Sequence, residues 1–128
     1  MVHWLAVAIG GAIGALARYG MSLLMAGADG HKFPLATMSV NVLGSFAMGV
    51  LFVLVVEKSL LPDSVRPVLM IGFLGAFTTF STFSLDTLSL WQNGDLFLAL
   101  LYALGTVVSC LAAISVAVWL TSLVLNTF

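Results

Sequence analysis

A run of hydroxyl side chains lies inside an otherwise apolar stretch, in the order Thr78, Thr79, Phe80, Ser81, Thr82, Phe83 and Ser84. A polar group in hydrocarbon costs several kcal/mol unless it finds a partner, so a membrane-spanning segment normally avoids such a run. The run therefore predicts a helix that breaks at mid-membrane and turns backbone groups and aromatic edges toward a passing solute.

The two aromatic residues of this run, Phe80 and Phe83, are three positions apart and share one face of a helix. An aromatic ring has a positive edge and a negative face, so ring edges among hydroxyls can replace part of the hydration shell of an anion. A cation would prefer the ring faces. This chemistry favours an anion pathway, and the alternative is that both rings only pack in the core or against lipid.

Two further polar residues lie within apolar stretches. Arg18 would attract anions if it lined an aqueous vestibule, or it could extend to the interface beside Tyr19. Asn41 shares a helical face with Ser45, and its amide offers two N–H donors to an anion or to a neighbouring carbonyl. Alternatively, Asn41 only cross-links helices, at about 0.6 kcal/mol.

The remaining polar residues do not indicate catalysis. Tyr102, Thr106 and Cys110 form a weakly polar stripe with a spacing of four residues, which helix packing alone can also explain. No cluster of His, Cys or carboxylate residues has metal-ligand spacing, and no Ser-His-Asp set can be assembled inside the membrane. We expect no enzymatic activity. A net charge of −1 also gives no basic surface for nucleic acid.

The composition is that of a membrane protein, with 62% hydrophobic and 7% charged residues. A soluble domain has about 45–50% apolar and about 25% charged residues. Apolar stretches cover residues 4–26, 35–56, 67–90 and 96–125, each near or above the roughly 20 residues that a transmembrane helix needs. We predict an all-α membrane protein with four transmembrane helices in a single domain, residues 1–128. The first stretch is expected to be a retained span and not a cleaved signal.

The connections at residues 27–34, 57–66 and 91–95 are short and hold most of the charged residues. One side of the membrane would carry Lys58 and Arg66, and the other only Lys32. Since orientation follows this bias, so small a difference barely specifies a direction. The chain could therefore insert both ways and pair with an inverted copy of itself, which would supply the symmetry that many transporters carry internally.

Small residues at a spacing of four predict close helix packing in lipid. The pairs are Gly10 with Gly14, Gly11 with Ala15, and Ser45 with Gly49. Such pairs are common in helical membrane proteins, so they support packing more than they identify a partner.

Three segments together resemble the CrcB/Fluc family of bacterial fluoride channels. They are GALARY at residues 14–19, TMSVNVLGSF at 37–46 and GFLGAFTTFSTFS at 72–84. The third segment is highly specific, and the fourth span is similar only loosely. The resemblance implies a dual-topology antiparallel homodimer in the lipids of the bacterial inner membrane, with two antiparallel pores that let fluoride leave the cytoplasm and give resistance to it.

The resemblance also implies roles for individual residues. Phe80 and Phe83 would be the pore phenylalanines, Asn41 a donor near them, and Arg18 the vestibule cation. The implied fluoride pathway consists of Phe80, Phe83, Asn41, Ser81, Thr82, Tyr102, Thr106 and Arg18. The backbone carbonyls of Gly75 and Thr78 would hold a structural Na⁺ at the dimer interface. Cys110 stands where relatives commonly have a hydroxyl, and Asp86 where an acidic residue is common.

Two other classes of protein compete with this interpretation. Small multidrug transporters also have four spans and dual topology, but they need a membrane-embedded Glu in the first span, which here has no acidic residue. A structural or hole-forming membrane protein would not require the hydroxyl-rich break.

Overall fold

The computed structural model describes residues 2–25 and 33–127, and its regular elements over these residues are helices. In chain order they are α1 (Val2–Met25), α2 (Leu35–Leu51), η2 (Phe52–Glu57), η3 (Arg66–Leu74), α3 (Gly75–Phe77), α4 (Phe80–Gln92) and α5 (Leu96–Thr127). The η segments have the wider turn of a π-helix. Together the described elements make four spans long and apolar enough to cross a membrane: His3–Met25, Leu35–Glu57, Arg66–Gln92 and Leu96–Thr127. The predicted all-α fold with four membrane-length helices is confirmed.

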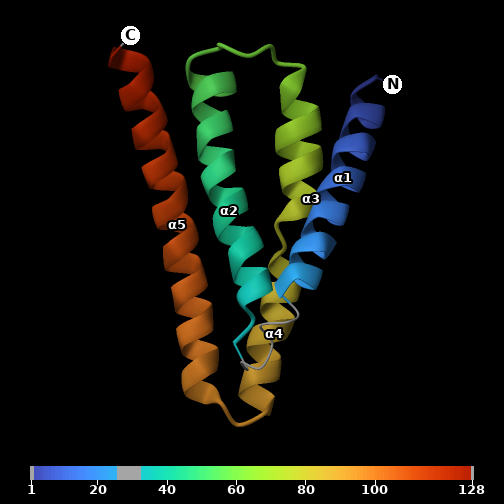
Figure 1. The fold of residues 1–128 in the computed structure, drawn as a ribbon, viewed down its shortest axis with the longest axis vertical. Coiled ribbons are helices and arrows are strands. Elements are labelled where there is room, and N and C mark those ends of the chain that lie inside the picture. The colour runs from blue at the N-terminus through green and yellow to red at the C-terminus, as the bar shows by residue number, and fades with distance from the viewer. Residues whose placement is uncertain (1, 26–32, 128) are drawn as a thin grey trace.

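The spans lie side by side and run alternately up and down (Figure 1). Across that view α5 is followed by α2, then by η3 with α3, and finally by α1. α1 packs on η3 and α3, whereas α5 packs on α2 and α4. The start of α1 and the end of α5 lie at the same end of the bundle as the connection from η2 to η3. The first predicted connection, with Asp29, His31 and Lys32, lies mostly outside the described residues.

The turn between α4 and α5 follows from its sequence. Gly94 has a φ of 84°, a left-handed conformation that favours glycine. Its N–H donates to the carbonyl of Trp91 at 2.9 Å, and the N–H of Asp95 donates to the carbonyl of Leu90 at 3.0 Å. These bonds reverse the chain, so that α4 and α5 lie side by side.

Glycines explain why α1 fits closely against η3. Gly10 and Gly14 are buried, and a Cβ atom would meet the carbonyl oxygen of Val68 at Gly10 and that of Phe73 at Gly14. On the facing segment, a Cβ atom at Gly72 would lie 2.7 Å from the carbonyl oxygen of Val7. The predicted close approach at Gly10 and Gly14 is confirmed, because any larger residue would push the two backbones apart.

A second close contact joins α2 to α5. A Cβ atom at Gly49 would lie 2.7 Å from the carbonyl oxygen of Ile114 and 2.9 Å from the Cβ of Ala117. At Gly44, one turn or so earlier on α2, a Cβ atom would meet the methyl group of Thr78. The glycines of α2 therefore bring this helix close both to α5 and to the middle of the third span.

The third span is interrupted between α3 and α4. Thr78 has φ −79° and ψ 157°, and Thr79 has φ −151° and ψ 121°, so both residues are extended. They lie near the middle of the Arg66–Gln92 span. The predicted break in the third helix is confirmed.

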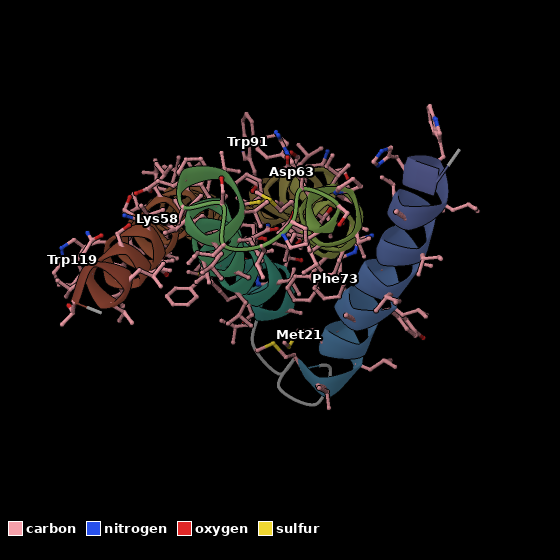
Figure 2. All side chains as sticks on the ribbon, turned by 90° about the horizontal axis from the view of Figure 1, so that it is seen from above. Met21, Lys58, Asp63, Phe73, Trp91 and Trp119 are labelled. Atoms are coloured by element: carbon pink, nitrogen blue, oxygen red, sulfur yellow. The ribbon has the colours of Figure 1, made fainter. Side chains whose placement is uncertain are left out.

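Much of the apolar surface of this chain faces outward. Leu16 of α1, Phe97 and Val108 of α5, and Trp119 are more than half exposed. Seen from above, Trp91 and Trp119 lie at the outer rim, whereas Phe73 lies between η3 and α1 (Figure 2). So large an exposed apolar surface suits hydrocarbon or another protein surface and not water.

Replacing Gly14 by Ala tests the packing of α1 on η3. The new methyl group would overlap the backbone of Phe73, so we expect Gly14→Ala to lower the free energy of unfolding by about 1–3 kcal/mol. Gly20→Ala is the matched control in the same helix, because nothing lies within 4 Å of its added Cβ. Thermal or denaturant unfolding in detergent measures both variants, and equal stabilities would contradict the close packing.

Candidate functional site

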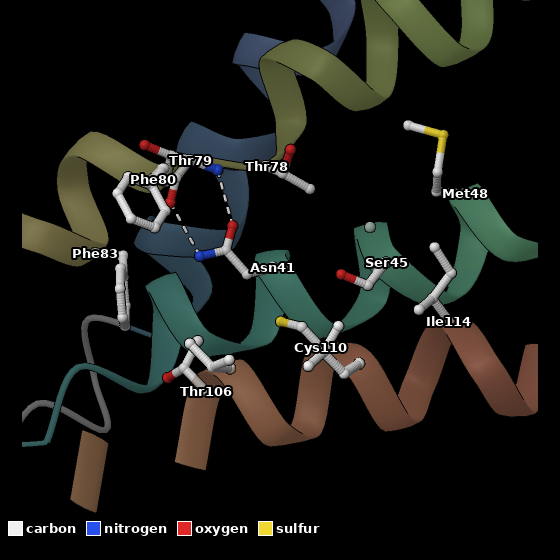
Figure 3. A pocket seen from close by; sticks show the side chains of 13 residues that line it. Asn41, Ser45, Met48, Thr78, Thr79, Phe80, Phe83, Thr106, Cys110 and Ile114 are labelled. Atoms are coloured by element: carbon white, nitrogen blue, oxygen red, sulfur yellow. Dashed lines mark hydrogen bonds between the residues drawn. The ribbon is translucent and has the colours of Figure 1, made fainter. Parts of the chain in front are cut away.

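A groove with a volume of about 360 Å³ lies where α2, the break, the start of α4 and α5 meet (Figure 3). Its polar lining comes from three spans that are distant in the sequence. The residues that carry this chemistry are Asn41, Ser45, Thr78, Thr79, Phe80, Phe83, Thr106 and Cys110. The fold therefore brings together four of the residues predicted for the fluoride pathway, namely Asn41, Phe80, Phe83 and Thr106.

Asn41 binds the break directly. Its Oδ1 accepts a hydrogen bond from the N–H of Thr79 at 2.8 Å, and its Nδ2 donates to the carbonyl of Thr79 at 3.0 Å. Figure 3 shows both bonds crossing from α2 to the extended residues. Because an amide has two N–H donors, one donor of Asn41 is left over for the groove.

The hydroxyls of the run are mostly bonded close to where they stand. Thr79 is the N-cap of α4, and its Oγ1 accepts from the N–H of Thr82 at 3.3 Å and donates to the Oγ1 of Thr82 at 3.1 Å. The hydroxyl of Thr78 donates to the carbonyl of Leu74 at 2.8 Å, and that of Ser84 to the carbonyl of Phe80 at 2.9 Å. These local bonds make the hydroxyl run tolerable inside an apolar span.

The two pore candidates, Phe80 and Phe83, occupy different environments. Their ring centroids are 5.4 Å apart at an interplanar angle of 48°. Phe83 is 9% exposed and packs on Tyr102, also at 5.4 Å. Phe80 is 78% exposed and projects from the chain. The ring of Phe83 is therefore packed in the core, whereas the ring of Phe80 lies at the surface of the single chain.

Tyr102 lies in the core behind Phe83 and does not line the groove. Its side chain is fully buried, and its ring packs edge-on against Phe33 at 5.4 Å. Its hydroxyl donates to Oδ2 of Asp86 at 3.3 Å. Asp86, whose role the sequence left unassigned, therefore has Tyr102 as a partner across the α4–α5 contact.

The hydroxyl of Thr106 differs from the bonded hydroxyls of the run. It is 3% exposed, and its Oγ1 has no hydrogen-bond partner within the part of the chain that the structure describes. A buried polar group without a partner is costly and calls for an explanation. Because Thr106 and the half-buried Cys110 both line the groove, the predicted stripe on α5 reaches the site at these two positions.

Arg18 lies at a second cavity, of about 240 Å³, between α1, α2, the break and the start of α4. This cavity is lined by Ala15, Arg18, Tyr19, Ser22, Thr37, Val40, Thr79 and Thr82. Thr79 lines both cavities. Arg18 is half-buried, and the residues described at the two cavities include no acidic side chain. The positive charge of Arg18 and the lack of acidic side chains among these lining residues both favour an anion here.

The carbonyls of Gly75 and Thr78 are among those that the break leaves without their helical donors. In a continuous helix the N–H of Thr79 would bond to Gly75, and that of Thr82 would bond to Thr78. Here the first donates to Asn41 and the second to the hydroxyl of Thr79. Gly75 is also exposed. Both carbonyl oxygens named for Na⁺ are thus released from the helix, and hard oxygen donors of this kind suit such a cation.

These features define a small four-span membrane protein whose third span opens at its middle beside a polar groove. The chain belongs to the family described as "CrcB-like protein, Camphor Resistance (CrcB)", whose sequence model matches residues 5–118. It is a multi-pass protein of the bacterial inner membrane. The family indicated by the three sequence segments is confirmed.

Several bacterial relatives carry the name "Fluoride-specific ion channel FluC". The protein of Saccharophagus degradans is 55% identical over 121 residues, which cover 94% of this chain and 90% of the relative. That of Magnetococcus marinus is 52% identical over 107 residues, covering 84% and 87%. That of Hahella chejuensis is 48% identical over 123 residues, covering 96% and 97%.

The sequence did not single out Thr79 as a site residue, although the structure places it at the centre of the candidate site. It caps α4, binds Asn41 and lines both cavities. The available signal was a threonine directly before the apolar start of a helical segment, since threonine is a common N-cap residue. Ser81 is exposed, with its hydroxyl 3.4 Å from that of Thr79.

Two nearly isosteric changes on α5 should differ in their effect on stability. Tyr102→Phe keeps the ring packing but leaves Asp86 without its phenol donor, so we expect a loss of about 1–3 kcal/mol in unfolding free energy. Thr106→Val removes a buried hydroxyl that has no partner among the described residues, so stability should be unchanged or rise by about 1 kcal/mol. Unfolding in detergent compares the two variants, and a larger loss in Thr106→Val would contradict this assignment.

Proposed function

We propose that this protein is a fluoride-selective ion channel through which fluoride leaves the cytoplasm passively. The observation that carries the proposal is the groove in which Phe80, Phe83, Asn41 and Thr106 meet beside the broken third span. Relatives that are 48–55% identical over most of the chain are named as fluoride-specific channels. The protein acts as a channel and not as an enzyme.

The groove has chemistry that suits a small, strongly hydrated anion. Donors that the fold leaves unused can replace hydration water, and the second amide N–H of Asn41 and the hydroxyl of Thr106 are such donors here. The edges of the Phe80 and Phe83 rings add partial positive charge. Arg18, at the second cavity that Thr79 also lines, raises the local concentration of anions. Ser81 and Thr82 belong to the same pathway at the start of α4.

Passive conduction is sufficient for fluoride export. Hydrogen fluoride crosses membranes when the outside is acidic, then dissociates in the neutral cytoplasm and is trapped as an ion. The inside-negative membrane potential favours expulsion of an anion by about 2.3 kcal/mol per 100 mV. No residue that couples transport to another energy source is required.

The functional unit that we propose is an antiparallel homodimer embedded in lipid. Support comes from Phe80, which is 78% exposed although it lies at the groove, and from the nearly balanced charge of the connections. An inverted second copy would cover Phe80 and complete the groove from the open side. The outward apolar faces of α1 and α5 would contact lipid.

A structural Na⁺ at the dimer axis is the remaining part of the proposal. The carbonyls of Gly75 and Thr78 would hold it, since both have lost their helical donors at the break. A two-fold axis through the break would bring these oxygens together from both copies without an acidic side chain. When bound, the ion supplies positive charge that compensates carbonyl dipoles in a medium with little water.

Isoleucine substitutions at the two phenylalanines test the anion pathway. Phe80→Ile and Phe83→Ile keep bulk but remove the polarised ring edge, so fluoride efflux from liposomes should fall at least about tenfold, or about 1.4 kcal/mol in the barrier. Phe97→Ile is the matched control, because Phe97 is 77% exposed on α5 and lies away from the groove. Parallel assays with chloride and a lipophilic cation distinguish a fluoride channel from a multidrug transporter or an unselective pore. Unchanged fluoride efflux in both variants would show that the two rings only pack and take no part in the anion pathway.

Added charge in the connections tests the antiparallel dimer. Gln92→Lys with Asn93→Lys should force one orientation, and Leu60→Lys with Ser64→Lys the opposite one, because lysine-rich connections stay in the cytoplasm. Each double variant alone should lose fluoride efflux, whereas co-expression of the two should restore it. Cysteine labelling from either side reports the orientation. Native protein that faces one way only would exclude the dimer.

A further inference from the structure

The amide of Asn41 occupies hydrogen-bonding positions that normally belong to a helix backbone. In an uninterrupted third span, the N–H of Thr79 would donate to the carbonyl of Gly75. The structure has this N–H 2.8 Å from Oδ1 of Asn41 instead, while Nδ2 of Asn41 donates to the carbonyl of Thr79 at 3.0 Å. The side chain of Asn41 therefore satisfies both the N–H and the C=O of Thr79, as a neighbouring β-strand would.

These two hydrogen bonds stabilise an extended Thr79 inside an apolar span. Thr79 is 8% exposed, so its N–H has little access to water. An unsatisfied backbone group in hydrocarbon costs several kcal/mol. Without Asn41, the most accessible partner for this N–H is the carbonyl of Gly75, and that bond would continue α3 through the break.

The shape of α2 brings the amide within reach. Gly44 lies three residues after Asn41, and a Cβ atom there would meet the methyl group of Thr78. The absence of a side chain at Gly44 therefore lets α2 approach the break, and Asn41 then spans the remaining distance.

We propose that Asn41 is a positioning residue that holds the third span open and so keeps the carbonyl of Gly75 free for a cation. The inference rests on the Na⁺ site proposed above. It gives Asn41 a role separate from donating to fluoride, because bracing the break uses Oδ1 and one N–H of the amide while the second N–H remains. One side chain then contributes to both the anion groove and the cation site.

The conformation of Thr79 is the direct test of this role. Thr79 is the only threonine that directly follows another threonine, so ¹³C,¹⁵N-threonine labelling isolates its amide in a carbonyl-edited NMR spectrum of the protein in lipid. The wild-type Cα shift should be that of an extended residue. In Asn41→Leu it should move to the helical range, and Asn41→Ala serves the same purpose if the leucine variant does not assemble. A Thr79 shift that stays extended in these variants would overturn the proposal.

Asn41→Asp separates the two roles of the side chain. A carboxylate still accepts from the N–H of Thr79 in a charge-assisted bond, although it cannot donate to the Thr79 carbonyl. Because this N–H is the donor that would otherwise continue the helix to Gly75, Thr79 should remain extended. The same negative charge repels an anion, so fluoride efflux should be lost. An Asn41→Asp protein whose Thr79 becomes helical would also overturn the proposal.

The Na⁺ dependence of dimer stability is the second readout. Replacing a large organic cation by Na⁺ should raise the thermal midpoint of the wild type and of Asn41→Asp, and this rise should be lost in Asn41→Leu. Ser45→Ala, one turn further along the same face of α2, is the control that should keep the rise. Retention of the full rise in Asn41→Leu would overturn the link to the cation. A wild type without any Na⁺ effect would exclude the cation site itself, and the Thr79 shift would then decide alone whether Asn41 holds the break.

Discussion

The structure depends on one constraint, which is that backbone N–H and C=O groups inside a membrane must find partners within the protein. The two extended residues Thr78 and Thr79 break the ladder of helical bonds in the third span, and the amide of Asn41 and the hydroxyl of Thr79 take over two of its donors. The close approach of α2 at Gly44 and the groove beside the break both follow from this arrangement.

The same bonds explain how a hydroxyl-rich motif can serve an ion without destabilising the helix. Thr78 and Ser84 donate to carbonyls of their own span, and Thr82 is bound to Thr79. Most hydroxyls of the run therefore already form hydrogen bonds within the protein. What remains for a solute is a small set of unused donors and ring edges around Asn41, Phe83 and Thr106. A strongly hydrated ion gains most from donors that no protein group already satisfies, because these need no bond to be broken first.

Hydropathy and residue type were sufficient to predict the four spans, the break and close helix packing at Gly10 and Gly14. They were insufficient wherever the outcome depends on which helices are neighbours. Tyr102 was assigned to the polar stripe by its spacing from Thr106, yet its ring is buried between Phe33 and Phe83 and its hydroxyl binds Asp86. The bond from Asn41 to Thr79 joins positions 38 residues apart, so no local pattern contains it. The π-helical turns of η2 and η3 also leave no clear trace in a continuous apolar run.

The even number of spans has a consequence for how such a protein can be duplicated. α1 begins and α5 ends at the same end of the bundle (Figure 1). If two copies of the gene were fused head to tail by a short linker, the second copy would enter the membrane from that same side and so have the same orientation as the first. A single polypeptide with two opposed halves would need an additional crossing between them. Separate chains that insert in either direction, as proposed above, would avoid this requirement, and one gene would then encode both halves of an inverted pair.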